Sequence, residues 1–325
     1  KKTTKKTYQR RGRTSNILIM PRHISLVFPG QGSQHIGMLE NIDSCFIDEV
    51  KPIVNSALDF DLIDIINNGN SDDLNRTSIT QPALLLASYL SYKQLKSSLD
   101  FHVNTICGHS LGEYSALAVG DALNLEQALQ LVHQRGLLME ECDSGSMYAI
   151  LNCDLDKIIN YCEQVQNKLS LVVSPANINS PKQIVIAGDI DAVEEVILLL
   201  KNDGIRKCIK LKVSVPSHCK LMTDAANKFE NLLQKVNLKL PKIELIHNFN
   251  ASSSPDIHEL KLNLINQLTS PIQWIQTMEY LNQKNSIIIE CGPNKVLTGI
   301  AKSNNLDSVI STSMDNHLEV LKSLL

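Results

Sequence analysis

VNTICGHSLGEY, residues 103–114, is the stretch of this 325-residue chain that decides the fold. Its first half is apolar and predicts a buried strand, while LGEYSALAVG from Leu111 onward predicts a helix. Gly108 and Gly112 flank the turn between them, so Ser110 lies at its apex. In the G-x-S-x-G elbow the glycines let strand and helix approach closely, and the strained turn projects the serine hydroxyl toward backbone N–H groups. This geometry suits acyl transfer, although similar glycine and serine strings also occur in plain turns.

The segments before this turn predict an α/β core. A strand at 23–28 leads into the glycine-rich loop PGQGSQHIGM at 29–38, and helices are predicted at 45–58, 62–67 and 80–99. We expect Thr80 to cap the last of these helices, with Pro82 near its first position. The loop contains neither G-x-x-x-x-G-K-[ST] nor G-x-G-x-x-G, so nucleotide binding is not predicted. It does offer unobstructed backbone N–H groups, above all that of Gln31.

LEQALQLVHQRGLLMEE, residues 125–141, predicts an amphipathic helix. Its apolar half includes Leu131, Val132 and Met139, and Arg135 falls inside that half. A guanidinium does not lose its proton, so a buried arginine needs an anionic or hydrogen-bonding partner. The simpler interpretation is a structural ion pair, or a side chain that reaches past Leu131 to solvent. The alternative is a cationic clamp for a substrate carboxylate.

Between residues 144 and 213 the pattern changes to a compact βαββαβ unit, which is typical of a ferredoxin-like fold. Strands are predicted at 146–151, 170–173, 183–187 and 205–213, and helices at 154–166 and 191–202. We therefore expect a large domain, residues 23–143 and 214–325, with an α/β-hydrolase-like core and a parallel sheet, into which the subdomain 144–213 is inserted. Its last strand carries basic residues that form a solvated face or, alternatively, a dock for an acidic partner: Arg206, Lys207, Lys210 and Lys212.

The chain returns to the core through VSVPSHC, residues 213–219, and we expect Ser217 and His218 to open a helix that ends at Val236. A histidine at this place could act as a base toward an elbow serine, although a lone histidine is more often structural. Further strands are predicted at 243–249, 286–290 and 308–311, and helices at 257–268 and 316–325. The other histidines, His109 and His247 among them, have no comparable context.

Composition excludes several classes of function. Hydrophobic residues make up 43% of the chain and charged residues 20%, and no apolar run approaches the roughly 18 residues that span a bilayer, so no membrane span is predicted. Residues 1–16 carry seven Lys or Arg and no acid, which leaves the remainder with 24 basic and 34 acidic residues and a net charge of −10. That balance argues against nucleic acid as a partner. The eight cysteines contain no C-x-x-C pair, so no metal site is predicted.

The first 22 residues predict a disordered basic leader. They have no apolar period and no hydrophobic run of signal-peptide type, and Met20 is a candidate for the true start. We expect a cytoplasmic protein. A basic, Thr-rich segment without acids also fits an organelle transit peptide, so targeting by residues 1–16 stays open as a lesser alternative.

Several stretches together resemble one family, the malonyl-CoA:acyl-carrier-protein transacylases of type II fatty acid synthesis. The resemblance covers roughly residues 24–301 and rests on these motifs in family order: FPGQGSQ, TQPALL, GHSLGEYSAL, the arginine in LVHQRGLLM, SPANINSPKQIVIAG, VSVPSH, QLTSPIQW and ECGPNKVLTGI. Some of them are shared with acyltransferase domains of polyketide and large fatty acid synthases. Two departures from the family pattern are Asn294, where many members have glycine, and the segment ECDSGSMYAI, which is shorter than usual. Both are expected to affect the rim of the cleft.

The resemblance implies a role for each matching residue. Ser110 would be the nucleophile that accepts the malonyl group, and His218 the base, oriented by the backbone carbonyl of Gln267. The backbone N–H groups of Gln31 and Leu111 would form the oxyanion hole. Arg135 would pair with the free malonyl carboxylate. The family further implies malonyl-CoA as substrate, an acyl carrier protein as partner, no bound cofactor, and a monomer.

Two other functions share parts of this pattern. A serine esterase or thioesterase uses the same elbow, histidine and oxyanion hole but lets water attack, and it has no use for Arg135. A catalytically inactive scaffold would bind a carrier protein without chemistry, although the presence of Ser110, His218 and Arg135 argues against it. The sequence does not choose between malonyl and methylmalonyl donors.

Overall fold

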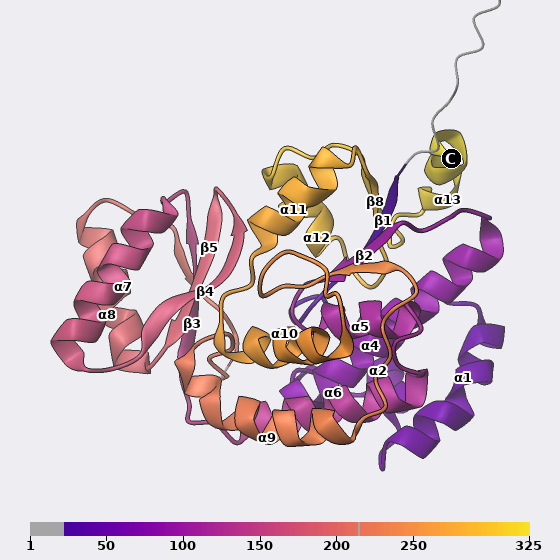
Figure 1. Cartoon of the computed structure of the whole chain (residues 1–325), viewed down its shortest axis with the longest axis horizontal. Helices are drawn as coiled ribbons and strands as arrows, with labels where there is room; N and C mark the ends of the chain where they lie inside the picture. Colours follow the sequence, from indigo (N-terminus) through magenta and orange to yellow (C-terminus); the bar gives the residue numbers. More distant parts are fainter. Residues whose placement is uncertain (1–22, 214) are drawn as a thin grey trace, which may run out of the picture.

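The structure is a computed structural model that describes residues 23–213 and 215–325. The predicted leader, residues 1–22, lies outside this range. Figure 1 shows two regions side by side, a larger one built around β1, β2 and β8 and a smaller one built around β3, β4 and β5. Each region has its own sheet.

The sheet of the larger region has five strands in the order β7-β2-β1-β8-β9, and every neighbouring pair is parallel. The strands are β1 Ile24–Phe28, β2 Thr105–Gly108, β7 Glu244–Ile246, β8 Ile287–Glu290 and β9 Val309–Ser311. Apart from the exposed Glu244, their residues are buried, as expected for a parallel sheet covered on both faces. The predicted α/β fold with a parallel sheet is confirmed.

Helices cover both faces of this sheet. Successive side chains of a strand point to opposite faces, and in these strands both sets are buried, so each face packs against helices. Leu26 and Ile106 pack into the core on one face, and Val27 and Cys107 into the core on the other. The helices of this region are α1 Ser44–Ala57, α2 Leu62–Asn68, α3 Ser71–Leu74, α4 Thr77–Ser98, α5 Gly112–Val119, α6 Leu125–Glu140, α9 Thr223–Lys235, α10 Ile257–Thr269, α11 Trp274–Gln283, α12 Val296–Ser303 and α13 His317–Leu324. Among all helices in the described ranges, none has the length and apolar character needed to cross a lipid bilayer.

Helix α4 begins earlier than predicted. It starts at Thr77 after Arg76, so Thr80 is not its N-cap, and Pro82 lies inside the helix rather than at its first position. A proline there has no N–H for the carbonyl of Ser78, four residues earlier. That carbonyl instead accepts a hydrogen bond from Nδ1 of His133 on α6, at 2.8 Å. A partner from another helix therefore compensates for the internal proline.

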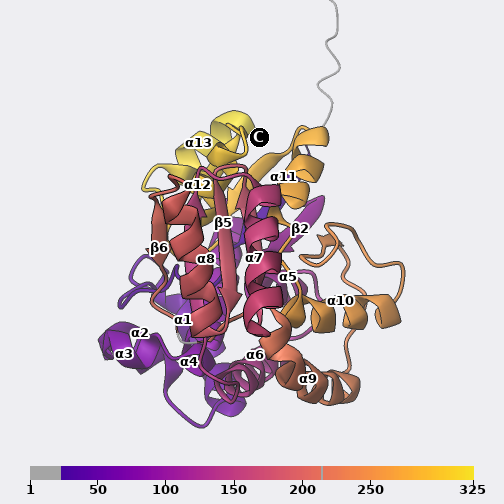
Figure 2. The same ribbon diagram turned by 90° about the vertical axis from the view of Figure 1, so that its left-hand side faces the viewer.

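The smaller region has an antiparallel sheet in the order β4-β5-β3-β6. Its elements are β3 Ser146–Leu151, α7 Leu155–Leu169, β4 Val173–Ser180, β5 Gln183–Gly188, α8 Ile190–Asn202 and β6 Cys208–Lys210. Figure 2 shows α7 and α8 side by side over one face of this sheet. Their apolar faces pack on the strands in a separate core that includes Ile158, Ile186 and Val196.

Two strands of this region differ from the prediction. The strand expected at 170–173 is wrong, because Ser170 ends α7 in a left-handed conformation and β4 begins only at Val173. Strand β4 contains a proline and two asparagines, which individually disfavour strands, and it is held by pairing with β5 across two register shifts. The strand expected at 205–213 is limited to Cys208–Lys210, at an edge of the sheet.

Candidate active site

Ser110 lies at a sharp turn between β2 and α5, with a φ of 51°. The flanking glycines are required by close packing. A Cβ on Gly108 would lie 2.0 Å from the carbonyl carbon of Gly112, and a Cβ on Gly112 would lie 2.0 Å from the carbonyl oxygen of Phe28. No side chain fits at either position, so these two residues allow β1, β2 and the start of α5 to meet behind the serine.

The hydroxyl of Ser110 lies 2.8 Å from Nε2 of His218, although 108 residues separate them. His218 has a φ of 64° and precedes a short 3-10 turn, Lys220–Met222, that leads into α9 at Thr223. The prediction that Ser217 and His218 open the helix is therefore wrong. The left-handed backbone at His218 interrupts the helix and is part of what presents the imidazole to the elbow.

The other ring nitrogen of His218, Nδ1, donates a hydrogen bond to the backbone carbonyl of Gln267 at 2.7 Å. This contact places the proton on Nδ1 and leaves Nε2 free to accept from the Ser110 hydroxyl. Burial, together with the positive charge of Arg135, lowers the pKa of His218 to about 3. The imidazole is therefore neutral at physiological pH, which is the form that a general base requires.

Arg135 is buried on α6 with 1% of its surface exposed. Its Nη1 donates to Oε1 of Gln81 at 2.8 Å and its Nη2 to Oε1 of Gln267 at 2.9 Å, and the guanidinium lies 5.3 Å from the ring centre of Tyr114. Its Nε has no hydrogen-bond partner. Within residues 23–213 and 215–325 no carboxylate forms a salt bridge with it, so the structural ion pair is not found. Burial lowers the pKa of this uncompensated guanidinium.

Gln267 on α10 links these groups, although the sequence pointed only to its carbonyl. Its backbone oxygen accepts from His218, its Oε1 accepts from Arg135, and its Nε2 donates to the backbone oxygen of Ser110 at 3.1 Å. One residue therefore contacts the predicted nucleophile, base and carboxylate-binding group. The structure brings these four residues together.

Gln31 and Leu111, the two predicted oxyanion-hole residues, lie next to the elbow. Leu111 follows Ser110 directly and is buried, and Gln31 is exposed on the loop after β1. This loop touches the elbow, because a Cβ on Gly30 would lie 2.5 Å from the carbonyl oxygen of His109. Gln31 and His109 line a cavity of about 390 Å³ whose other walls come from the small sheet and from α12.

Asn248 is a site residue that the sequence analysis missed. Its Oδ1 accepts from the backbone N–H of Ser110 at 2.6 Å and its Nδ2 donates to the carbonyl of Gly108 at 2.6 Å. These two bonds hold the elbow in its left-handed conformation. Asn248 follows β7, the neighbour of β2 in the parallel sheet, and the carboxyl ends of such strands are where site residues gather. That position was the signal that could have identified it.

Two histidines that the sequence analysis set aside also have defined partners. Nε2 of His109 lies 2.8 Å from Oδ1 of Asn179 on β4, and its ring packs edge-on against Trp274. His247 is fully buried against Glu113, with 2.6 Å between Nδ1 and Oε1. The partners of both histidines come from distant segments, so the sequence around either histidine gave no sign of them.

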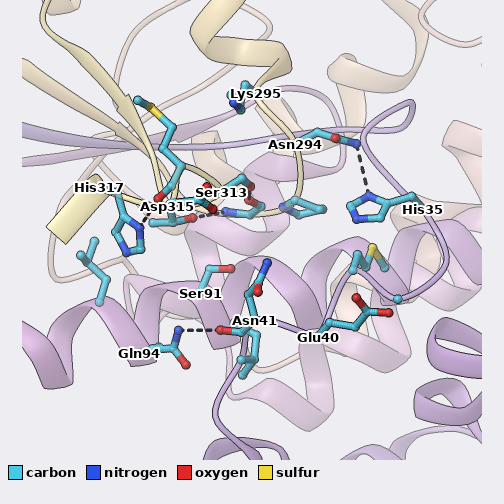
Figure 3. Close-up of a pocket in the computed structure, with 18 of the residues that line it drawn as sticks. His35, Glu40, Asn41, Ser91, Gln94, Asn294, Lys295, Ser313, Asp315 and His317 are labelled. Carbon is cyan, nitrogen blue, oxygen red and sulfur yellow. Dashed lines mark hydrogen bonds between the residues drawn. The ribbon is translucent and has the colours of Figure 1, made fainter.

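A second, larger cavity of about 610 Å³ lies away from Ser110, between α4, the loop after β1 and the loop after β8. Figure 3 shows Asn294 and His35 facing each other across its edge. Asn294 has a φ of 64°, a conformation that favours glycine and that asparagine tolerates, and its Nδ2 donates to the carbonyl of Ser33 at 2.7 Å. Asn294, which stands where many family members have glycine, therefore links the loop after β8 to the loop after β1 that carries Gln31. In the described ranges, no three His, Cys, Asp or Glu side chains are grouped so as to hold a metal ion.

Comparison with known proteins agrees with this geometry. Residues 25–311 match the acyl transferase domain family. A malonyl CoA-acyl carrier protein transacylase of Haemophilus influenzae is 38% identical over 288 residues, which cover 86% of this chain and 92% of the relative. The chain belongs to the malonyl CoA-acyl carrier protein transacylase family.

Solved structures of this family have the same fold. The malonyl CoA-acyl carrier protein transacylase of Coxiella burnetii superposes with a TM-score of 0.89 at 34% identity, covering 93% of this chain and 97% of that one. A malonyl-transacylase in complex with its type II PKS acyl-carrier protein superposes with a TM-score of 0.87 at 33% identity, covering 93% of this chain and 99% of that one.

Proposed function

We propose that this transacylase family member moves the malonyl group from malonyl-CoA to the phosphopantetheine thiol of an acyl carrier protein through a malonyl-serine intermediate. One observation carries the proposal: Ser110, the neutral His218 and the buried Arg135 all contact Gln267. This arrangement supplies a nucleophile, a base and a cation at one place. Membership of the family and the relative solved with an acyl-carrier protein support the choice of donor and acceptor.

In the first half-reaction, Oγ of Ser110 attacks the thioester carbonyl while its proton passes to Nε2 of His218. The C–S bond then breaks, and the CoA thiolate leaves with the proton from His218. In the second half-reaction, the carrier thiol gives its proton to His218 and its sulfur attacks the carbonyl of the malonyl ester. The C–O bond to Ser110 then breaks, and Oγ leaves with the proton from His218. Backbone N–H groups of Gln31 and Leu111 stabilise both tetrahedral intermediates, each donor contributing about 10² to 10³ in rate.

Arg135 accounts for selection of a dicarboxylic acyl group. The malonyl carboxylate lies one methylene from the reacting carbonyl and can accept two parallel hydrogen bonds from a guanidinium. An acetyl group leaves the buried charge of Arg135 without an anion. Removing one partner of a buried ion pair costs about 3–5 kcal/mol, which corresponds to roughly 10² to 10⁴ in selectivity.

The direct test is mass spectrometry after mixing the protein with malonyl-CoA. We expect a malonyl adduct on Ser110 that disappears when a carrier protein is added, and no adduct in Ser110→Ala. Free malonate in place of malonyl-carrier would indicate a thioesterase. Carrier binding without any adduct would indicate a scaffold.

The same proposal includes the finer description of the fold. The order β3-α7-β4-β5-α8-β6 and the separate core under α7 and α8 support a ferredoxin-like subdomain at 144–213. The five parallel strands support an α/β-hydrolase-like domain formed by 23–143 and 214–325. No cofactor has a role in this chemistry. The monomeric state and the cytoplasmic location stay predictions.

The cavity between the two regions is the proposed route for the phosphopantetheine arm. It begins at Gln31 beside the elbow and is bounded by β4, β5 and α12. Four exposed lysines, Lys182, Lys212, Lys295 and Lys302, each neighbour a lining residue in sequence. Their positive charge complements the phosphate of the arm. The remaining basic residues of the β6 segment extend this surface, although Lys210 forms an ion pair with Glu194.

A further inference from the structure

Glu113 is a fully buried carboxylate in the first turn of α5, three residues after Ser110. Its Oε2 accepts from Nε2 of Gln267 at 2.7 Å and from the backbone N–H of Asn248 at 3.1 Å. Its Oε1 lies 2.6 Å from Nδ1 of His247. The carboxylate does not touch the Ser110 hydroxyl, the His218 ring or the Arg135 guanidinium, so the mechanism above gives it no role.

The contacts of Glu113 decide which way the Gln267 amide points. An ionised carboxylate only accepts hydrogen bonds, so it requires the NH₂ group of Gln267 to face it. A guanidinium only donates, so Arg135 requires the oxygen of the same amide. One orientation of the Gln267 amide meets both requirements, with its Nε2 facing Glu113 and its Oε1 facing Arg135. Without Glu113, a rotated amide would place its NH₂ group against the donors of Arg135.

The far end of the carboxylate is held equally firmly. Nε2 of His247 lies 2.7 Å from Oγ of Ser254, which in turn accepts from Nδ2 of Asn263 at 2.9 Å. His247 and Asn263 are both buried. These bonds hold the Glu113 carboxylate in one orientation. The carboxylate in turn orients the Gln267 amide, which is hydrogen-bonded to the guanidinium of Arg135.

We propose that Glu113 is a positioning residue for acyl selectivity: it holds the Gln267 amide so that Arg135 keeps its place for a substrate carboxylate. This inference rests on the proposed function, because it names what sets the malonyl preference of the same site. Glu113 acts through Gln267 and Arg135 and touches no reacting atom.

The test compares loading of malonyl and acetyl groups from their CoA esters in Glu113→Met and Glu113→Gln. Methionine fills the space but has no charge and only a weakly accepting sulfur for the Gln267 amide, so we expect the malonyl-to-acetyl ratio of kcat/KM to fall about 10- to 100-fold. Glutamine can still present an oxygen to Gln267 if His247 moves its proton to Nε2, so we expect a ratio within about fivefold of the original. Nitrogen NMR signals of the Arg135 guanidinium, assigned with Arg135→Lys, should shift only in the methionine variant.

Glu290 offers a matched control. It is likewise a fully buried carboxylate with three donors, from Leu297 and Thr298, and it makes no bond to Gln267 or Arg135. Glu290→Met should lower stability without changing the ratio. Should Glu113→Met fail to fold, Glu113→Asp serves instead, because the shorter side chain withdraws the carboxylate from Gln267.

Equal losses for both donors in Glu113→Met, or an unchanged ratio in Glu113→Asp, would overturn the proposal. A parent protein that forms no malonyl adduct at all would instead refute the proposed function. In that case the Arg135 NMR signals still decide whether Glu113 positions the guanidinium, since they need no substrate.

Discussion

His218 obtains its orientation from a backbone carbonyl rather than from a carboxylate. The carbonyl of Gln267 fixes the ring and its tautomer without adding a charge that would favour the imidazolium. Burial and Arg135 then both disfavour the protonated ring. In the proposed mechanism, a malonyl carboxylate bound at Arg135 would offset part of this effect and make His218 a stronger base.

This arrangement predicts how acetyl loading depends on pH. Removal of the guanidinium in Arg135→Met takes away the largest influence, after burial, that lowers the pKa of His218, so that pKa rises from about 3 toward its usual 6.5. The acid limb of acetyl loading should therefore move to higher pH, as measured by adduct formation between pH 3 and 7. Arg135→Lys retains the positive charge, so in this variant acetyl loading should fall off at the same low pH as in the parent protein. An acid limb of acetyl loading that stays at the same pH in Arg135→Met would contradict the effect of the Arg135 charge on the pKa of His218.

At the scale of elements, the packing of α4 against α6 depends on a polar contact that replaces a lost helix bond. The carbonyl of Ser78 has no N–H from Pro82 and is paired with His133 instead. The same two helices carry Gln81 and Arg135, which are hydrogen-bonded to each other. The proline therefore affects the alignment of the helices that hold the guanidinium.

We expect His133→Phe to reduce the free energy of unfolding by about 1–3 kcal/mol, because the Ser78 carbonyl loses its donor while the ring contact with Phe60 is retained. Urea denaturation measures this loss. His102→Ala, at an exposed histidine, should stay within about 0.5 kcal/mol of the parent. A His133→Phe protein as stable as the parent would show that water satisfies the carbonyl.

For the whole molecule, the two regions join along one edge of β4. The backbones of Ala176 and Ile178 exchange hydrogen bonds with Ile272, and Asn304, which caps the end of α12, donates to the carbonyl of Asn179. The side chain of Asn179 is hydrogen-bonded to His109, the residue before Ser110. The small sheet, which lies beside the larger region in Figure 1, is thus attached to the elbow itself. The cavity beside Gln31 has walls from both regions.

The distribution of cysteines tests this packing. Cys45 is exposed, Cys142 and Cys208 are partly buried and the other five are buried, with burial raising the pKa of Cys162 and Cys219 to about 12. A thiol-specific disulfide reagent at pH 8 should therefore react rapidly with one thiol, that of Cys45, in the native protein. After denaturation it should react with all eight thiols. Cys45→Ser should abolish the rapid phase. Several rapid thiols in the native protein would contradict the tight cores.

The sequence by itself determined the local features of this protein. The strand, serine turn and helix around Ser110 and the buried arginine on α6 follow from glycine spacing and apolar period, which act over a few residues. The resemblance to the family motifs added His218, Gln267 and the two residues predicted to form the oxyanion hole. Strand β4 was mispredicted because pairing with β5, and not its own composition, makes it a strand.

Only the tertiary structure decided which distant groups meet. Gln267 lies 157 residues from Ser110 and 132 from Arg135, yet it is bonded to both. Asn248 and His247 reach the elbow because they follow β7, which pairs with β2. Glu113 on α5 is joined to the site through Asn248 and through Gln267 on α10. Hydrogen bonds of this kind depend on distances of a few tenths of an ångström, which folding sets and sequence spacing does not encode.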